Sequence, residues 1–311
     1  MKKFGLIGAA GYIAPRHMKA IKDSGNELIA AFDTSDSVGI IDTYFPKASF
    51  FTAFERFDRY IEKLKYEKNI FLDYISICSP NNFHDAHIRF TLRSGANAIC
   101  EKPLVINVDN VEKLIMAEEK SNHKVYNILQ LRLHPSIIDL KNKISESKNK
   151  IFDIELTYIT SRGRWYDYSW KGDIEKSGGI ATNIGVHFFD MLSWIFGDFK
   201  SIKTFENKPN VSSGYLELKN ANVKWFLSTD FKFLPNDSIK NNKTTFRSIK
   251  IDGEEIEFSD GFTDLHTKVY EDILKGNGYG IKDAYPSIFI VDKIRNLKTS
   301  ALKGDYHTFL K

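Results

Sequence analysis

A glycine-rich turn near the N-terminus constrains the fold more than any other feature of the chain. The apolar run Phe4–Ile7 leads directly into Gly8-Ala-Ala-Gly11-Tyr-Ile-Ala14, and a helical pattern follows. In such a turn Gly8 permits a tight bend, Gly11 lets a pyrophosphate approach the backbone, and Ala14 lets the helix pack closely. The helix N-terminus offers N–H groups and partial positive charge to phosphates. We therefore expect a strand–turn–helix unit that binds a dinucleotide; the alternative is an ordinary strand–helix turn.

The first 130 residues continue this alternation of short apolar runs and longer helical patterns. We expect strands at Phe4–Ile7, Leu28–Phe32, Tyr74–Cys78, Ala96–Cys100 and Val125–Leu129. Helical patterns lie near residues 12–23, 52–66, 84–94, 108–121 and 135–145. Strands buried on both faces read as continuous apolar runs, and this order favours parallel pairing. The fold class predicted for residues 1–130 is an α/β, Rossmann-type doubly wound parallel sheet.

Residues 131–311 have a different pattern, in which strands follow one another with few helices between them. A long strand at Phe152–Ser161 precedes a loop rich in Arg, Trp and Tyr and a helix near residues 182–196. Further strands are expected near residues 200–207, 212–219, 223–231, 244–251 and 254–258, and closing helices near 263–275 and 283–299. This order predicts an α+β domain with a large, mostly antiparallel open sheet for substrate binding and oligomerisation. The closing helices are candidates to pack back on the first domain.

Two polar stretches interrupt these patterns. We expect the domain junction near Ser145–Lys150 and a mobile surface loop at Asn236–Lys243.

Composition excludes several classes of protein. The chain has 311 residues, enough for about two domains, and 42% of them are hydrophobic. A net charge of only +4, spread along the chain, argues against a nucleic-acid surface but suits an anionic substrate. No apolar run is long enough for a membrane span or a signal peptide. Cys78 and Cys100 lie in apolar runs and are expected to be buried, with no disulfide and no metal site, in a cytoplasmic protein.

An acidic residue at the end of the second expected strand indicates which dinucleotide is bound. Asp33 follows Leu28–Phe32, where its carboxylate can accept hydrogen bonds from the adenosine ribose hydroxyls. Residues 34–36 contain no Arg or Lys to receive a 2′-phosphate, which Asp33 would also repel. We therefore expect NAD as the cofactor and not NADP. The alternative is that Asp33 is a solvated cap.

The loop after the Tyr74–Cys78 strand lies where ligands of open α/β sheets bind. It begins Ser79-Pro80-Asn81-Asn82-Phe83-His84, and Asn81 and His84 could contact the cofactor or a sugar. An asparagine here could equally cap the next helix. The cofactor-binding residues that we predict are Gly8, Ala10, Gly11, Tyr12, Ile13, Asp33, Ser79, Asn81, His84, Glu101, Lys102 and Gln130.

Glu101-Lys102-Pro103 ends another strand at the same edge of the sheet. The proline biases Lys102 toward an extended backbone and stops the strand there, so the ammonium group is held in place. A lysine that is partly desolvated beside an oxidised nicotinamide has its pKa pushed down and becomes useful in proton transfer. Lys102 is therefore a candidate catalytic residue; the alternative is an ordinary surface lysine.

Together these segments resemble the glucose–fructose oxidoreductase/inositol dehydrogenase (Gfo/Idh/MocA) family. The resemblance covers essentially the whole chain and includes an Arg-x-His-Pro stretch at Arg132–Pro135 and a Gly-x-His-x-x-Asp helix at Gly185–Asp190. It implies that Lys102 is catalytic, together with an Asp and a His four residues apart. Those two positions are Asn183 and His187 here.

The asparagine at position 183 departs from the family pattern. Residues four apart on a helix share a face, so Asn183 can still point to the same side as His187. It cannot balance an imidazolium as a carboxylate would, so the division of proton transfer between Lys102 and His187 stays open. The alternative for His187 is a core histidine, and we expect Asp190 to be structural.

Within the family, the segments Tyr158–Tyr166, Ser169–Asp173 and Gly179–His187 look like those of the UDP-N-acetyl-2-amino-2-deoxyglucuronate 3-dehydrogenases of bacterial surface-polysaccharide and O-antigen pathways. Such a substrate carries two phosphates and a carboxylate, and an Arg/Lys-rich aromatic loop can bind anions and stack on uracil. The alternative is that these aromatic residues belong to the core or an interface. The substrate-binding residues that we predict are Lys102, Arg132, Arg162, Arg164, Trp165, Tyr166, Trp170, Lys171, Asn183 and His187.

The resemblance implies that the protein oxidises the 3-hydroxyl of UDP-N-acetylglucosaminuronate to a ketone with NAD. It further implies a homotetramer and, as in some members, NADH recycling by 2-oxoglutarate. Two rival hypotheses remain. One is a dehydrogenase of a cyclitol or a free hexose, which would leave the cationic loop without anionic partners. The other is a dinucleotide-binding regulator without chemistry, which would have no need of Lys102 and His187.

Overall fold

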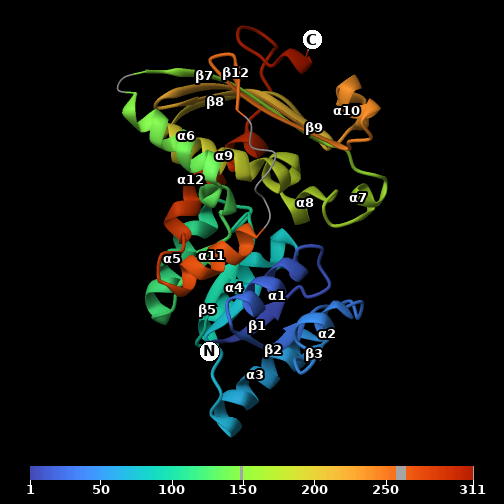
Figure 1. Ribbon diagram of the computed structural model, residues 1–311, viewed down its shortest axis with the longest axis vertical. Helices are drawn as coiled ribbons and strands as arrows, with labels where there is room; N and C mark the ends of the chain where they lie inside the picture. Colours follow the sequence, from blue (N-terminus) through green and yellow to red (C-terminus); the bar gives the residue numbers. More distant parts are fainter. Residues whose placement is uncertain (148–149, 257–263, 311) are drawn as a thin grey trace. The chain divides into compact units, whose positions relative to one another are not determined.

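A computed structural model describes residues 1–147, 150–256 and 264–310, which form two compact units (Figure 1). The first unit comprises residues 1–130 together with residues 264–284, and the second comprises the rest of the described chain. A segment from late in the sequence therefore completes the first unit. Among the described residues, every helix is too short or too polar to span a lipid bilayer.

Sheet A of the first unit is a six-stranded parallel sheet in the order β3-β2-β1-β4-β5-β6. Its strands are β1 (Lys3–Ile7), β2 (Glu27–Phe32), β3 (Ser49–Phe51), β4 (Tyr74–Ile77), β5 (Asn97–Cys100) and β6 (Val125–Asn127). The order reverses direction at β1, because β2 lies on one side of it and β4 on the other. This arrangement confirms the predicted doubly wound parallel sheet, and ligands of such sheets bind where the order reverses.

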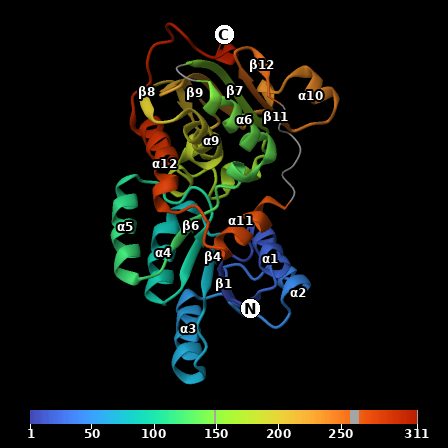
Figure 2. The same cartoon turned by 60° about the vertical axis from the view of Figure 1, so that its left-hand side comes forward.

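Helices cover both faces of sheet A. They are α1 (Ala14–Asp23), α2 (Ile40–Tyr44), α3 (Phe54–Lys68), α4 (His84–Arg93), α5 (Asp109–Ser121) and α11 (Leu265–Leu274). Figure 2 shows α4 and α5 on one side of the sheet and α1 with α11 on the other, and α1 packs directly on α11. Helix α1 buries His17, Met18 and Ile21 at the spacing of one helical face.

Sheet B of the second unit has the order β12-β11-β7-β10-β9-β8. Its strands are β7 (Phe152–Thr160), β8 (Phe199–Lys208), β9 (Val211–Leu218), β10 (Ala221–Ser228), β11 (Thr245–Ile251) and β12 (Glu254–Glu255). The β7–β10 pair is parallel and the other pairs are antiparallel, which confirms the predicted mostly antiparallel sheet.

One face of sheet B carries the hydrophobic core of the second unit. The helices of this unit are α6 (Pro135–Glu146), α7 (Trp165–Tyr168), α8 (Ile174–Ser177), α9 (Val186–Phe196), α10 (Asn236–Lys240) and α12 (Ile281–Asn296), whose first residues belong to the first unit. Figure 1 shows α6 and α9 beneath the sheet. Trp225 of β10 is fully buried against Phe189 of α9, with their rings 5.5 Å apart. Burying each such side chain stabilises the fold by about 1.5–3 kcal/mol.

The C-terminal segment covers part of the opposite face of sheet B (Figure 1). His307 is fully buried, and its Nε2 lies 2.9 Å from Oγ1 of Thr157 on β7. The Phe309 ring stacks on Phe226 of β10 with centroids 5.2 Å apart. His307 and Phe309 therefore shield the middle of this face of sheet B from solvent.

Several local expectations differ from the structure. Helix α2 and strand β3 were not predicted, and the expected loop at Asn236–Lys243 contains α10. The units divide after Gln130 and not at Ser145–Lys150, because α6 buries Ile137, Leu140 and Ile144 in the core of the second unit. The strand expected near residues 254–258 is β12, which covers Glu254–Glu255. Some residues of the expected elements lie outside the described residues, namely 148–149, 257–258 and 263.

The burial of His307 predicts a pH-dependent stability. Burial lowers the pKa of His307 from 6.5 to about 4. Between these values the unfolded chain binds a proton that the folded chain does not. The contribution of neutral His307 to the free energy of unfolding is therefore complete above about pH 6.5 and is lost as the pH falls toward 4. We expect this residue alone to lower the free energy of unfolding by about 1–2 kcal/mol at about pH 5.

Urea unfolding at about pH 7.5 and about pH 5 measures this effect in the wild type and in His307→Gln. The variant should lose less stability between the two values than the wild type. His123→Gln, at a partly exposed position, is the matched control and should behave like the wild type. An equal loss in His307→Gln and the wild type would show that this histidine does not titrate on unfolding.

Candidate active site

The glycine turn after β1 lies against the backbone that follows β4. Gly8 has φ +89°, and a Cβ atom there would lie 2.5 Å from the carbonyl carbon of Cys78. The Gly8 and Ala9 N–H groups both donate to Phe32 O, at 2.8 and 3.1 Å. Only glycine fits this position, because any side chain would collide with main chain that cannot move aside. The turn is therefore a narrow cradle of backbone atoms, as a pyrophosphate site requires.

Asp33 is fixed beside this turn. Its Oδ2 accepts a hydrogen bond from Ala10 N at 2.9 Å, and its Oδ1 accepts one from Ser35 N at 2.9 Å. The carboxylate thus stands at the mouth of the turn, half-exposed, where it can accept hydrogen bonds from ribose hydroxyls. Two backbone donors orient it, so its position does not depend on a flexible side chain.

The residues present fit a dinucleotide. No side chain caps the N-terminus of α1, but Ala14 N and Arg16 N already donate to Gly11 O and Ile13 O, both at 3.0 Å, and Pro15 has no N–H. The positive end of the helix dipole therefore favours an anion here more than free N–H groups do. Gln130 carries a buried Oε1 that has no hydrogen-bond partner among the described residues, at the end of the unit that holds the turn. Such an orphaned acceptor is what a ligand donor would satisfy. Tyr12, in contrast, is 83% exposed, and its predicted contact with the cofactor is untested.

His84 joins the two loops that follow β4 and β5. Its Nδ1 lies 2.7 Å from Pro103 O and its Nε2 lies 2.9 Å from Ser79 O. Burial lowers the pKa of His84. The ring therefore contacts main chain on both sides, and its predicted role in binding cofactor or sugar stays a prediction. Asn81 is buried in the short 3-10 helix between the loop and α4.

Lys102 lies two residues after the end of β5, at the carboxyl edge of sheet A, and is half-buried. The Lys102–Pro103 peptide bond is cis. The backbone N–H of Lys102 donates to Oε2 of Glu101 at 3.1 Å. The Glu101 carboxylate is buried, with both oxygens engaged within the protein, and its predicted contact with the cofactor is untested.

In the second unit, Asn183 and His187 lie on either side of a change in helix type. Residues Ala181–Gly185 form a single π-helical turn that continues into α9. The wider turn was not predicted, and π turns inside helices are frequent at functional sites. Gly185 is needed here because a Cβ would lie 2.6 Å from Cδ1 of Leu227. Asn183 is buried and His187 is half-buried.

The amide of Asn183 is oriented by an aromatic hydroxyl. Its Nδ2 donates to the Tyr166 hydroxyl oxygen at 2.8 Å. Burial raises the pKa of Tyr166, so the phenol is neutral near pH 7. The structure places Tyr166 against Asn183, and its predicted role in binding substrate stays a prediction.

Arg132 and Asp190 form a buried ion pair. The two guanidinium nitrogens donate to the two carboxylate oxygens, Nη2 to Oδ1 at 2.7 Å and Nε to Oδ2 at 3.1 Å. This agrees with the structural role expected for Asp190, because the pair ties the segment before α6 to α9. Arg132 was predicted to bind substrate, and that role is untested. Breaking one side of such a pair typically costs about 3–5 kcal/mol.

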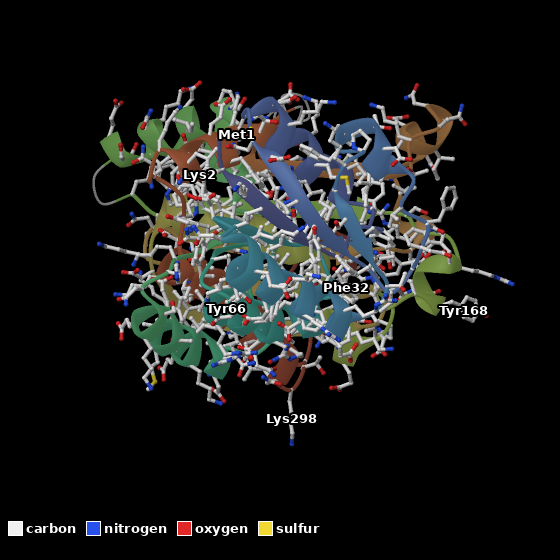
Figure 3. The ribbon with its side chains drawn as sticks, turned by 90° about the horizontal axis from the view of Figure 1, so that it is seen from below. Met1, Lys2, Phe32, Tyr66, Tyr168 and Lys298 are labelled. Carbon is white, nitrogen blue, oxygen red and sulfur yellow. The ribbon has the colours of Figure 1, made fainter. Side chains whose placement is uncertain are left out.

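The loop between β7 and α8 displays the predicted cationic and aromatic side chains. Arg162 and Arg164 are exposed, and Trp165 is 55% exposed. The ammonium of Lys171 lies 4.4 Å from the centre of the Trp170 ring. Figure 3 shows the neighbouring Tyr168 pointing away from the ribbon, in keeping with its 89% exposure. Of the predicted substrate residues in this loop, Arg162, Arg164 and Trp165 are therefore exposed to solvent, and their role in binding a ligand stays a prediction.

Sequence reasoning missed the buried groups behind Lys102. His17 and His266 both hydrogen-bond to Glu101, and Asn127 Nδ2 donates to Cys100 O and Glu101 O at 2.9 and 3.1 Å. The only available signal was His17, a polar residue at a core position of α1. The prediction that Cys78 and Cys100 are buried is confirmed, and burial raises the pKa of both thiols.

Comparison with known proteins bears directly on these features. Residues 2–128 match the GFO_IDH_MocA family, described as an oxidoreductase family with an NAD-binding Rossmann fold. Residues 144–230 match its C-terminal alpha/beta domain. Inositol 2-dehydrogenase of Rhizobium meliloti is 27% identical over 202 residues, which are 63% of this chain and 55% of that protein. The chain thus aligns with little more than half the length of that curated relative.

Solved structures match over nearly the whole chain. The WlbA (WbpB) dehydrogenase of Thermus thermophilus, in complex with NAD and UDP-GlcNAcA, is 47% identical. The match covers 99% of this chain and 100% of that one, with a TM-score of 0.95. A second structure of that enzyme, with NAD and alpha-ketoglutarate, has the same identity and TM-score and covers 99% of each chain. The WlbA dehydrogenase of Bordetella pertussis, at 18% identity, 94% coverage of each chain and a TM-score of 0.76, shares the fold.

Two family domains match in the expected order, and a relative at 47% identity is matched from end to end. The chain belongs to the Gfo/Idh/MocA family of oxidoreductases, whose N-terminal domain is an NAD-binding Rossmann fold.

Proposed function

We propose that the protein is an NAD-dependent dehydrogenase that oxidises the 3-hydroxyl of UDP-N-acetylglucosaminuronate to the 3-keto sugar. The observation that carries this proposal is the 47% identity, over 99% of this chain, to a dehydrogenase whose structure contains NAD and UDP-GlcNAcA. The exposed Arg162 and Arg164 support it, because this sugar nucleotide carries two phosphates and a carboxylate for cationic groups to bind.

The residues of the first unit have separable tasks in this reaction. The cradle at Gly8 and Gly11 binds the phosphates of NAD, and Asp33 binds the adenosine ribose hydroxyls. When bound, NAD supplies the group that accepts a hydride from the substrate carbon. Lys102, held at the carboxyl edge of sheet A, contacts the reacting hydroxyl and takes part in removing its proton.

His187 is proposed to share proton transfer with Lys102. Asn183 supplies no negative charge to support an imidazolium, so the neutral imidazole is favoured and can accept a proton. The hydrogen bond from Asn183 to Tyr166 fixes the amide that stands beside this face of the helix. The remaining predicted substrate residues, Trp165, Trp170 and Lys171, would bind the nucleotide end.

The alpha-ketoglutarate complex of the Thermus thermophilus enzyme favours a further proposal about turnover. We infer that NADH stays bound and is reoxidised when 2-oxoglutarate is reduced. A homotetramer, a cytoplasmic location and a role in O-antigen synthesis are proposed on the resemblance. The rival substrate class is a cyclitol, for which the 27% identity to an inositol dehydrogenase is the support.

A substrate panel tests the proposed function. The protein is incubated with NAD and each of several UDP-sugars, UDP-N-acetylglucosaminuronate, free hexoses and myo-inositol, with and without 2-oxoglutarate. We expect a 3-keto product from the uronate only, and multiple turnovers only when 2-oxoglutarate is present. Turnover of myo-inositol and not of the uronate would overturn the proposed substrate. NAD binding without any turnover would favour the regulator.

Asp33 is expected to set the choice of cofactor. Asp33→Ala removes a charged acceptor of ribose hydrogen bonds, so NAD should bind about 10- to 100-fold more weakly. The difference in binding affinity between NAD and NADP should become smaller, because the repulsion between Asp33 and the 2′-phosphate of NADP is also lost. Calorimetric titration of both cofactors measures this, with Asp36→Ala, at an exposed neighbouring position, as the control. A wild type that binds NADP as tightly as NAD would refute this account of Asp33.

Lys102 is expected to affect the rate more than cofactor affinity. Positioned proton transfer contributes about 100- to 10,000-fold, so Lys102→Met should lose activity of that order while still binding NAD. Steady-state kinetics and NAD titration separate the two quantities. Lys113→Met, on the exposed face of α5, should be unaffected. Near-normal turnover by Lys102→Met would remove Lys102 from the chemistry.

Asn183→Asp should move the pH profile of the reaction. A carboxylate beside His187 raises the pKa of the imidazole, so activity should appear only at higher pH. An added charge could also repel an anionic sugar, but that effect raises KM and weakens as salt increases. The pH dependence of kcat at several salt concentrations distinguishes the two. If His187→Ala leaves the pH dependence of kcat unchanged, His187 is not the titrating base.

A further inference from the structure

A buried polar cluster lies behind Lys102 in the first unit. Oε1 of Glu101 accepts hydrogen bonds from Nε2 of His17 at 2.9 Å and from Nε2 of His266 at 3.0 Å. His17 belongs to α1 and His266 to α11, and all three side chains are at least nine-tenths buried. A carboxylate so far from water must be matched by donors, because an isolated buried charge is strongly unfavourable.

The donors of this cluster form a continuous chain. Nδ1 of His17 lies 2.7 Å from the hydroxyl of Tyr270, which lies 2.6 Å from Oγ of Ser76. A neutral imidazole has one N–H and one lone pair. If Ser76 donates to Tyr270 and Tyr270 donates to Nδ1, then Nε2 of His17 carries the proton that Glu101 accepts. Each donor then has one acceptor, with no proton missing or in excess.

The titration of these groups agrees with this assignment. Burial lowers the pKa of His17 more than its hydrogen bond to Glu101 raises it, so the ring is neutral near pH 7. Burial alone raises the pKa of Glu101, but the hydrogen bonds from His17 and His266 outweigh it and hold this pKa well below the usual range. The cluster thus contains a carboxylate held by imidazole N–H groups.

The second oxygen of this carboxylate reaches the main chain of the proposed catalytic lysine. Oε2 of Glu101 accepts the backbone N–H of Lys102 at 3.1 Å. On the same segment, the Asn127 amide holds the carbonyls of Cys100 and Glu101. The main chain that carries Lys102 is therefore bound by buried side chains on consecutive residues. Hydrogen bonds in such a low-dielectric setting are strong, and they fix geometry.

A metal ion is the other occupant that this cluster could suit. The ligand atoms of His17, Glu101 and His266 all lie within 4.8 Å of one another. A metal would need lone pairs on both Nε2 atoms, whereas the donor order assigned above, from Ser76 through Tyr270 to Nδ1 of His17, requires a proton on Nε2 of His17. The distances to Glu101 are those of N–H···O hydrogen bonds. The geometry favours protons over a metal.

We propose that His17, Glu101 and His266 are positioning residues for Lys102: the two imidazoles fix the Glu101 carboxylate, and this carboxylate fixes the backbone from which the Lys102 side chain extends. The proposal rests on the proposed function, in which Lys102 takes part in proton transfer. It assigns a role in the reaction to α11, which joins the cluster from late in the chain. None of the three side chains needs to touch the substrate.

Glu101→Gln separates the hydrogen bonds that Glu101 makes with the two histidines from the one that it makes with the Lys102 backbone. The glutamine oxygen can still accept from both histidines, but its NH2 group then faces the Lys102 N–H, and two donors cannot bond. We expect kcat to fall about 10- to 100-fold through misplacement of Lys102, with the affinity for NAD within about 3-fold of wild type. A kcat equal to wild type would overturn the proposal.

Hydrogen exchange tests the same bond without activity. In the ligand-free protein, the Lys102 amide of Glu101→Gln should exchange roughly 10-fold faster or more at single-residue resolution. The neighbouring Glu101 amide, which donates to Ile77 O at 3.0 Å, is the internal control and should be unchanged. An unchanged Lys102 amide would overturn the proposal, even if the protein proved to have no UDP-sugar activity. Absence of turnover in the wild type, with faster exchange in the variant, would instead overturn only the proposed function.

A pair of substitutions at His266 distinguishes hydrogen bonding from packing. His266→Gln keeps an N–H at the position of Nε2, whereas His266→Met keeps the volume and loses the donor. We expect His266→Gln to retain kcat within about 3-fold and His266→Met to lose about 10-fold. Equal kcat in the two variants would overturn the proposal, and this pair decides the matter if Glu101→Gln does not fold. Stoichiometric zinc in the purified wild type that is lost in His266→Met would overturn it in favour of a metal site.

Discussion

Parallel pairing of β1, β4 and β5 is the constraint on which the first unit depends. The register aligns Ile7 with Ile77 and Ile77 with Cys100, so the three strands end at one level. Because the strands run in the same direction, every loop that leaves them starts at the same edge of the sheet. Parallel pairing alone therefore brings together the glycine turn, the loop that begins at Ser79 and the segment that contains Lys102. Their close approach then demands a residue without a side chain at Gly8.

Much of the fold was predictable because its signals are local. Continuous apolar runs indicated the long strands of sheet A, and helical periodicity located α1, α3, α4, α5 and α6 to within a few residues. Strand β3 was not predicted, because it has only three residues, all of them half-buried, and lies at the edge of sheet A beside β2. The π turn at Ala181–Gly185 was not predicted, because it lies within an unbroken helical pattern. Its wider hydrogen bonding does not change the spacing of the hydrophobic residues.

The positions of Asp33 and Lys102 were predictable, because each lies in a short motif next to a strand end, and their roles stay predictions. The site was not predictable where a contact joins distant segments. Glu101 meets His17 across 84 residues and His266 across 165 residues. No local pattern encodes such pairs, because only the packing of α1 and α11 on the sheet brings them together. For the same reason, sequence could not distinguish a substrate arginine from the buried partner of Asp190 at Arg132.

The return of residues 264–284 to the first unit has a consequence for biosynthesis. Domains generally fold as units while the ribosome still extends the chain, beginning at the N-terminus. Here the nascent Rossmann sheet cannot be finished at residue 130, because Tyr270, which stacks on Phe4 at 5.9 Å, has not yet been translated. Until α11 emerges, the surface that it will cover is open and the Glu101 carboxylate lacks its second imidazole. The first unit therefore reaches its native state only after residues 264–284 have been translated, and not when its N-terminal segment leaves the ribosome.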